Sequence, residues 1–313
     1  MSIKTAFIFP GQGAQYAGMG RDLYDNSLAA KRIFELANKI LDIDIAGICF
    51  NGPEDALNRT DVSQPAILTH SLACLEAIRE KNPKADLYNI CGASAGLSLG
   101  EYTALAFAGA MSYEDAIKIV RKRGEFMQYA CDLKPSGMSS ILGLDREKVA
   151  EACKAAESAG VICMANFNSP GQIAISGDLK ALEIAGQKAK ELGAKRVMPL
   201  KVAGAFHSAL MQAAREKLEE ELKKIEIKKP VVPVVSNVTA DYVTEPAMIR
   251  ELLARQLMSP VMWQDSMERL GREGYRKFYE FGPNKVLTGL LRKIVPDAEG
   301  VNVEKFTDTS AAF

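Results

Sequence analysis

Histidine, tryptophan and unbalanced charge are what this chain of 313 residues has least of. It holds two histidines and one tryptophan, and its 39 Lys and Arg equal its 39 Asp and Glu. Without net charge the protein has no overall field to attract nucleic acid or an anionic membrane, so we expect neither as a partner. The six cysteines lack metal-ligand spacing, which predicts reduced core thiols and no metal site.

Long hydrophobic runs are also missing. No stretch is long enough to span a bilayer, and the first residues lead directly into a strand-like run with no visible signal peptide. We therefore expect a cytoplasmic protein. Apolar residues make up 48% and charged residues 25%, which is typical of globular domains, and the length allows one large or two modest ones.

The clearest pattern of secondary structure covers residues 132–202. Strand-like runs at 138–142, 161–166, 172–176 and 196–200 alternate with helical runs at 146–159 and 179–192. The order β-α-β-β-α-β and the length match a ferredoxin-like unit. We therefore predict an α/β protein with a large domain, residues 1–131 and 203–313, and a small inserted subdomain, residues 132–202.

Local signals also predict three features outside that unit. Gln64-Pro65 should open a helix that reaches Glu80, because proline at the first helical position loses no hydrogen bond. A charged helix should begin at His207 and run to about Lys224. The tail, residues 305–313, is small and polar and is expected to fray.

A serine between two glycines is the strongest chemical signal. Gly96-Leu97-Ser98-Leu99-Gly100 follows an apolar run and precedes a helical one, which is the layout of a nucleophile elbow. The glycines permit the sharp turn, and the serine stands at a helix N-terminus that favours negative charge. The bare pattern also occurs by chance in glycine-containing turns. A serine nucleophile usually needs a histidine base, which leaves only His70 and His207 as candidates.

Further stretches accompany the elbow along the chain. They are Phe9–Gln15, Gln64–Ile67, Arg121–Gln128, Asn166–Gln172, Gly204–Ser208, Ser236–Val238, Arg255–Leu257 and Gly282–Leu287. In this order they resemble the malonyl-CoA:acyl carrier protein transacylase family, essentially from end to end. The resemblance implies a large α/β-hydrolase-like domain with a mainly parallel sheet and an inserted ferredoxin-like subdomain.

The resemblance also implies an activity and its partners. The enzyme would move malonyl from malonyl-CoA to the phosphopantetheine thiol of acyl carrier protein, in two steps through malonyl-Ser98, for fatty-acid synthesis. No bound cofactor is expected, because malonyl-CoA is a substrate, and we expect a monomer. A serine esterase or thioesterase with the same Ser–His pair, or a non-catalytic binding module on this fold, remains an alternative.

The catalytic roles follow position by position from the resemblance. Ser98 resembles the nucleophile, His207 the general base, and Gln256 the residue whose backbone carbonyl orients the histidine ring. Gln12 and the N–H of Leu99 resemble the oxyanion hole. From the residues alone, His207 could instead cap a helix or be a buried, satisfied histidine, and Gln12 could serve its own turn.

Three residues resemble substrate contacts. Arg123 would pair the malonyl carboxylate with two parallel hydrogen bonds, although it could also be a solvated helix arginine, as Arg121 and Lys122 beside it are expected to be. Phe206 would crowd the methyl group of methylmalonyl. Asn168 would edge the cleft, or else belong to an Asn-Ser-Pro turn.

The chain departs from the family pattern at two positions. Leu97 stands where many members have histidine before the nucleophile, and Gly204 stands where malonyl-selective members often have histidine. Position 97 is not the general base in the family, so the expected mechanism is unchanged, whereas Gly204 slightly weakens the specificity argument from Phe206. The effect of both on substrate range stays open.

Overall fold

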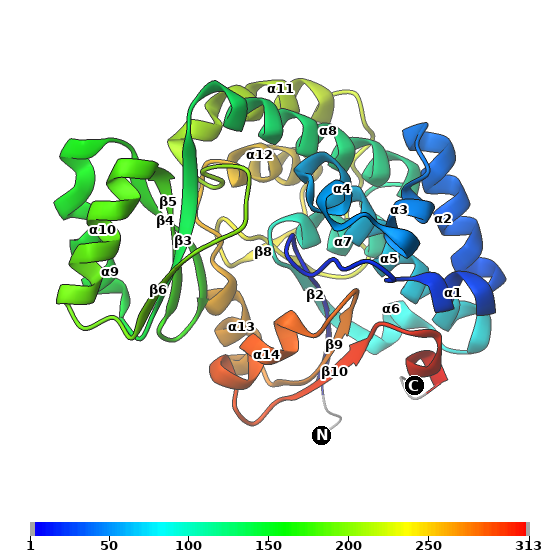
Figure 1. Ribbon diagram of the computed structural model, residues 1–313. Helices are drawn as coiled ribbons and strands as arrows, with labels where there is room; N and C mark the ends of the chain where they lie inside the picture. Colours follow the sequence, from blue (N-terminus) through cyan, green and yellow to red (C-terminus); the bar gives the residue numbers. More distant parts are fainter. Residues whose placement is uncertain (1–3, 311–313) are drawn as a thin grey trace.

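Two separate sheets organise residues 4–310, the part of the chain that the computed structural model describes (Figure 1). The larger sheet has the order β10-β9-β1-β2-β7-β8 and is parallel except for the last pair. Its strands are β1 (Lys4–Phe9), β2 (Cys91–Gly96), β7 (Val234–Val235), β8 (Tyr242–Val243), β9 (Tyr275–Phe281) and β10 (Glu299–Val303).

Helices cover both faces of this sheet. Successive side chains of β1 point to opposite faces and all are apolar from Ala6 to Phe9, so both faces must be buried. Phe7 and Phe9 enter a core with α5, α7 and α8, whereas Ala6 and Ile8 enter a core with α13 and α14. The helices outside the smaller unit are α1 (Arg21–Asn26), α2 (Leu28–Leu41), α3 (Ile45–Asn51), α4 (Glu54–Asn58), α5 (Thr60–Lys81), α6 (Leu87–Ile90), α7 (Leu99–Phe107), α8 (Tyr113–Leu133), α11 (Gln212–Leu222), α12 (Pro246–Gln256), α13 (Trp263–Arg272) and α14 (Val286–Ile294).

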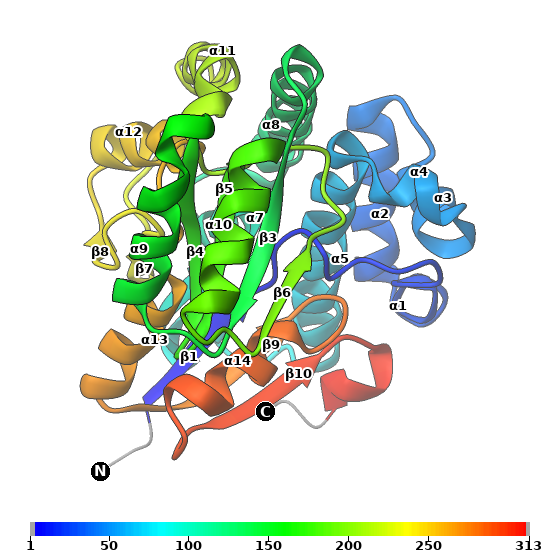
Figure 2. The same cartoon turned by 60° about the vertical axis from the view of Figure 1, so that its left-hand side comes forward.

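The smaller sheet is antiparallel and has the order β4-β5-β3-β6. Its strands are β3 (Ser136–Leu142), β4 (Ile162–Ser169), β5 (Gln172–Asp178) and β6 (Arg196–Pro199). Both of its helices, α9 (Arg146–Ala156) and α10 (Leu179–Glu191), lie side by side on one face, in front of the sheet in Figure 2. All six elements expected within residues 132–202 are therefore present in the expected order.

Backbone pairing joins the two sheets' units. The Phe167 N–H donates to the Val261 carbonyl at 2.9 Å, and the Val261 N–H donates to the Ala165 carbonyl at 2.8 Å. Arg146 makes two hydrogen bonds to the Asp265 carboxylate, at 2.9 and 2.6 Å, and its guanidinium stacks over the Phe167 ring. These contacts fix the smaller unit against α13 and the segment that precedes it.

The predicted start of the helix at Gln64-Pro65 is wrong. Helix α5 begins at Thr60, so Pro65 lies inside it. Proline has no N–H for the carbonyl four residues earlier, which is that of Asp61. A side chain from α8 supplies the missing donor, because Arg121 Nη1 lies 2.6 Å from the Asp61 carbonyl oxygen. Arg121 is accordingly only 21% exposed and is not the solvated side chain that the sequence suggests.

The helix expected from His207 is also wrong at its start. His207 has φ of +59°, outside the right-handed helical region, and α11 begins only at Gln212. The hydroxyl of Ser208 accepts the Leu210 N–H and caps the short turn Ala209–Met211 between them. His207 therefore lies in a loop before α11 and not in the helix.

The described part of the tail is docked on the large unit. Residues Phe306–Ser310 form a short 3-10 turn, and the Phe306 N–H donates to the Asp22 carboxylate at 2.8 Å. The buried Thr309 side chain donates to the Phe306 carbonyl. Fraying is thus wrong for residues 305–310, whereas the prediction for 311–313 falls outside the described residues.

Residues 4–310 contain neither a membrane-spanning helix nor a metal-binding cluster. No helix there is long and apolar enough to cross a membrane. The same residues contain no cluster of three or more His, Cys, Asp or Glu side chains placed to bind a metal ion. All six cysteines are free, and burial raises the pKa of each thiol.

Candidate active site

Ser98 occupies a strained turn between β2 and α7. Its φ of 52° and ψ of −102° are rare for a residue with a side chain. Any side chain at either flanking glycine would overlap backbone atoms. A Cβ at Gly96 would lie 1.9 Å from the Gly100 carbonyl carbon, and one at Gly100 would lie 2.1 Å from the Phe9 carbonyl oxygen. The predicted elbow geometry is confirmed.

Buried amide side chains hold this turn. Asn237 accepts the Ser98 N–H at 2.6 Å through Oδ1 and donates to the Gly96 carbonyl at 2.7 Å through Nδ2. Gln256 Nε2 donates to the Ser98 carbonyl at 3.0 Å and to Glu101 Oε2 at 2.6 Å. Glu101 also accepts the Asn237 N–H at 3.2 Å. Both backbone groups of Ser98 are therefore hydrogen-bonded, and Glu101 in turn holds the two amide residues that bond them.

His207 is placed as a base for Ser98. Its Nε2 lies 2.9 Å from Ser98 Oγ, and its Nδ1 lies 2.8 Å from the backbone carbonyl of Gln256. A carbonyl can only accept, so Nδ1 carries the hydrogen and Nε2 presents its lone pair to the serine. Burial, with Arg123 as a second cause, lowers the pKa of His207 to about 4. The imidazole is therefore neutral at pH 7.

Arg123 is buried directly beside Ser98, with 1% of its surface exposed. Its Nη2 donates to Ser98 Oγ and to Gln256 Oε1, each at 2.9 Å, and its Nη1 donates to Gln64 Oε1 at 2.6 Å. Its Nε has no hydrogen-bond partner within residues 4–310. Burial lowers the pKa of this guanidinium, but a guanidinium stays a cation in proteins. The site thus holds a desolvated positive charge with a donor to spare.

A cavity of about 290 Å³ opens onto these groups. Six of the eight predicted site residues line it: Gln12, Ser98, Arg123, Asn168, Phe206 and His207. Gln256 lies buried beneath it. Leu99 packs into the core, and its N–H is among those that a helix leaves unpaired at its N-terminus. A larger hollow of about 750 Å³ runs between α10 and β6, but neither Ser98 nor His207 lines it.

Comparison with known proteins places this geometry in a family. The acyl transferase domain family matches residues 6–308. The chain belongs to that family. It is 47% identical to the malonyl CoA-acyl carrier protein transacylase of Bacillus subtilis over 93% of this chain and 90% of the relative. It is 43% identical to the protein of that name from Staphylococcus aureus strain MW2, over 97% of each chain.

Solved structures resemble this acyl transferase closely. An acyl-carrier-protein-S-malonyltransferase from Bartonella henselae superposes with a TM-score of 0.95 at 36% identity, covering 99% of this chain and 98% of the other. A malonyl-transacylase in complex with a type II PKS acyl-carrier protein gives a TM-score of 0.93 at 39% identity, covering 99% and 98%. The mixed fold, with a mainly parallel sheet and a separate antiparallel one, is therefore shared.

The two departures from the family pattern differ in kind. A Cβ at Gly204 would lie 2.4 Å from Cys131 Sγ, so a side chain there would require Cys131 to move in this acyl transferase. Leu97, by contrast, lines the cavity beside Ser98. Leu97 therefore makes the pocket wall more apolar, whereas Gly204 does not line it.

Sequence reasoning assigned no role to two residues of the acyl transferase site, Glu101 and Asn237. Both are buried, with 1% of each exposed, and burial raises the pKa of Glu101 to about 7. One signal was available, since Glu101 is the only charged residue between Leu87 and Tyr113. A single carboxylate in an apolar stretch must find buried partners, which in this case are amides beneath the elbow.

Proposed function

We propose that this chain transfers malonyl from malonyl-CoA to the phosphopantetheine thiol of acyl carrier protein, for fatty-acid synthesis, as the names of its relatives indicate. One observation carries the choice of acyl group. The buried Arg123 guanidinium reaches Ser98 Oγ at 2.9 Å inside a small cavity, so an acyl group on Ser98 meets a cation. Malonyl brings the carboxylate that such a site requires.

Acylation begins with proton transfer within the Ser–His pair. His207 Nε2 takes the Ser98 hydroxyl proton as Oγ attacks the thioester carbonyl of malonyl-CoA. The Leu99 N–H and the Gln12 side chain stabilise the resulting oxyanion, and one such donor contributes about 2.7–4 kcal/mol. The C–S bond then breaks, and His207 returns the proton to the departing thiolate of coenzyme A.

Deacylation repeats these steps with a new thiol. His207 removes the proton of the phosphopantetheine thiol, whose sulfur attacks the malonyl ester, and Ser98 leaves with the proton that His207 holds. Gln256 keeps the ring oriented through its carbonyl. A neutral carbonyl supports the imidazolium less than a carboxylate would, which suffices because a thiolate is a good leaving group.

Specificity rests on leaving no charge unpaired. Acetyl would leave the Arg123 cation desolvated and without an anion, which is costly in a buried site. Phe206 crowds a branched acyl chain, a discrimination of about 1–3 kcal/mol. Asn168 lines the side of the cavity formed by the smaller sheet.

The remaining parts of the proposal concern the fold and the setting. Along the chain, the small sheet has its strands in the order second-third-first-fourth, which supports a ferredoxin-like subdomain at 132–202 inserted in an α/β-hydrolase-like domain, 1–131 and 203–313. We further propose a cytoplasmic monomer that needs no bound cofactor.

Intact-protein mass spectrometry after mixing with malonyl-CoA tests the function. We expect a malonyl adduct that persists in water, disappears on adding holo acyl carrier protein, and is absent from Ser98→Ala. Release of free malonate without an acceptor thiol would instead indicate the esterase or thioesterase. If neither an adduct nor free malonate forms, the remaining alternative is a non-catalytic binding module.

A further inference from the structure

The first turns of α5, near the active site, lack one backbone hydrogen bond of the helix. Pro65 is the sixth residue of the helix, so the Asp61 carbonyl has no helical N–H donor. Asp61 is 4% exposed, and an unpaired carbonyl there would be destabilising. Arg121 of α8 fills the gap through Nη1, at 2.6 Å.

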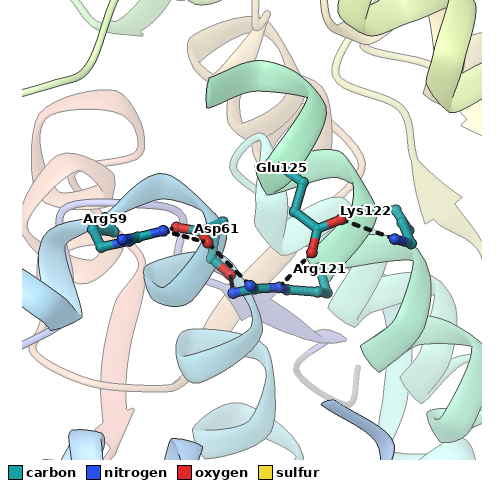
Figure 3. Close-up of polar contacts among 5 residues, drawn as sticks. All are labelled: Arg59, Asp61, Arg121, Lys122 and Glu125. Carbon is teal, nitrogen blue, oxygen red and sulfur yellow. Dashed lines mark hydrogen bonds and ion pairs between the residues drawn. The ribbon is translucent and has the colours of Figure 1, made fainter. Parts of the chain in front are cut away.

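Every nitrogen of the Arg121 guanidinium is engaged (Figure 3). Nη2 lies 3.1 Å from Asp61 Oδ2, and Nε donates to Glu125 Oε1 at 2.8 Å. Arg59 donates to the Asp61 carboxylate at 3.1 and 3.0 Å. Burial acts to raise the pKa of Asp61, but Arg59 and Arg121 hold it below its usual range. The contact is therefore a charged, two-point clamp between α5 and α8.

The clamp lies close in sequence to the cation of the active site. Gly124 brings the helices together, since a Cβ there would lie 2.7 Å from both Asp61 Cα and the Thr60 carbonyl oxygen. From the same turn of α8, Arg123 donates to Gln64 of α5 at 2.6 Å. Helix α8 thus carries both the residues that contact the start of α5, Arg121 and Gly124, and the residue that contacts Ser98, Arg123.

We propose that Arg121 is a positioning residue for the acyl carboxylate. It replaces the helical hydrogen bond that Pro65 removes, and so fixes the backbone that presents Gln64 to Arg123. If the first turns of α5 shift, Gln64 Oε1 moves away from Arg123 Nη1 and the guanidinium loses one of its orienting contacts. This inference rests on the proposed malonyl transfer.

Arg121→Met is the primary test, with Lys122→Met as the matched control. Lys122 is the next residue, is exposed, and also pairs with Glu125. Steady-state loading is measured with malonyl-CoA and acetyl-CoA. A misplaced Arg123 guanidinium binds the malonyl carboxylate less well but leaves the Ser–His pair intact, so we expect about a tenfold higher KM for malonyl-CoA in Arg121→Met, unchanged acetyl loading, and wild-type values in Lys122→Met.

A rescue variant separates positioning from general stability. Pro65→Ala restores an N–H opposite the Asp61 carbonyl, so the double variant Arg121→Met/Pro65→Ala should regain most of the lost preference for malonyl over acetyl. Thermal unfolding is recorded for each protein. If Arg121→Met does not fold, Arg121→Lys is assayed in its place; because it keeps one donor for that carbonyl it should retain the malonyl-to-acetyl ratio, and a lost ratio in folded Arg121→Lys would overturn the inference.

Three outcomes are distinguishable. An altered melting temperature with an unchanged malonyl-to-acetyl ratio overturns the inference. A folded double variant that fails to recover the ratio does the same. Wild-type protein that takes no malonyl at all would count against the proposed function instead.

Discussion

At the scale of single residues, the site depends on His207 being kept neutral. Its Nε2 lies 2.9 Å from Ser98 Oγ, its Nδ1 lies 2.8 Å from the Gln256 carbonyl oxygen, and no carboxylate within residues 4–310 hydrogen-bonds to the ring. Burial lowers its pKa first, and the nearby Arg123 cation lowers it further. The base is therefore ready at neutral pH without prior loss of a proton.

This electrostatic arrangement predicts the pH dependence of acyl loading. The unperturbed pKa of histidine is 6.5, and that of His207 is lowered to about 4, so protonation of His207 should cause no loss of loading from pH 8 down to about pH 5.5. Arg123→Met removes a cation that opposes the imidazolium, so the acidic limb should move to higher pH. Loading by acetyl-CoA, measured across pH, checks both proteins. A wild-type limb centred at pH 6.5 would rule out a lowered pKa.

The residues beneath the elbow show how far sequence reasoning reaches. Ser98 and its glycines could be found because they form a short motif, and His207 because the chain has only two histidines. Asn237 could not be given a role, because its bonds to Ser98 and Gly96 join positions 139 and 141 residues apart. Such partners are defined only once the chain is folded.

At the scale of elements, α5 and α8 set the position of the Arg123 guanidinium, the cation of the site. The elements of the smaller sheet were predicted well, because strand and helix periodicities alternate clearly there. The start of α5 was predicted wrongly, because the usual rule for proline was overridden by an arginine from another helix. A local rule cannot anticipate a donor that arrives from 60 residues away.

The close contact of these helices predicts opposite effects of one substitution at two glycines. Gly124→Ala forces a Cβ within 2.7 Å of the α5 backbone, so it should destabilise the protein by about 1–3 kcal/mol despite the better helix propensity of alanine. At Gly289 of α14, no atom of the described residues outside the adjoining turns of the helix lies within 4 Å of the added Cβ. Gly289→Ala should therefore stabilise by up to about 1 kcal/mol.

Urea unfolding measures both variants against the wild type. The two helical glycines are matched controls for each other, since the same methyl group is added in each case. Equal effects at Gly124 and Gly289 would show that the α5–α8 contact is looser than the structure indicates. Reduced malonyl preference in Gly124→Ala would further link this contact to Arg123.

At the scale of the whole molecule, two sheets joined by backbone pairing enclose a cavity whose cation faces the nucleophile. The larger sheet provides Ser98 at the end of β2, and helices on one of its faces provide Arg123 and Gln64. The smaller sheet closes the other side with Asn168 of β4. Neither unit holds the complete site, so specificity belongs to their fixed arrangement.

The central claim is that Arg123 selects an acyl group with a carboxylate. The most direct measurement offers wild type, Arg123→Met and Lys122→Met equal amounts of malonyl-CoA and acetyl-CoA and reads the acyl-enzyme by intact mass. We predict mainly malonyl on the wild type and on Lys122→Met, and a loss of that preference of about 100-fold or more in Arg123→Met. An unchanged ratio in a folded Arg123→Met protein would contradict the account.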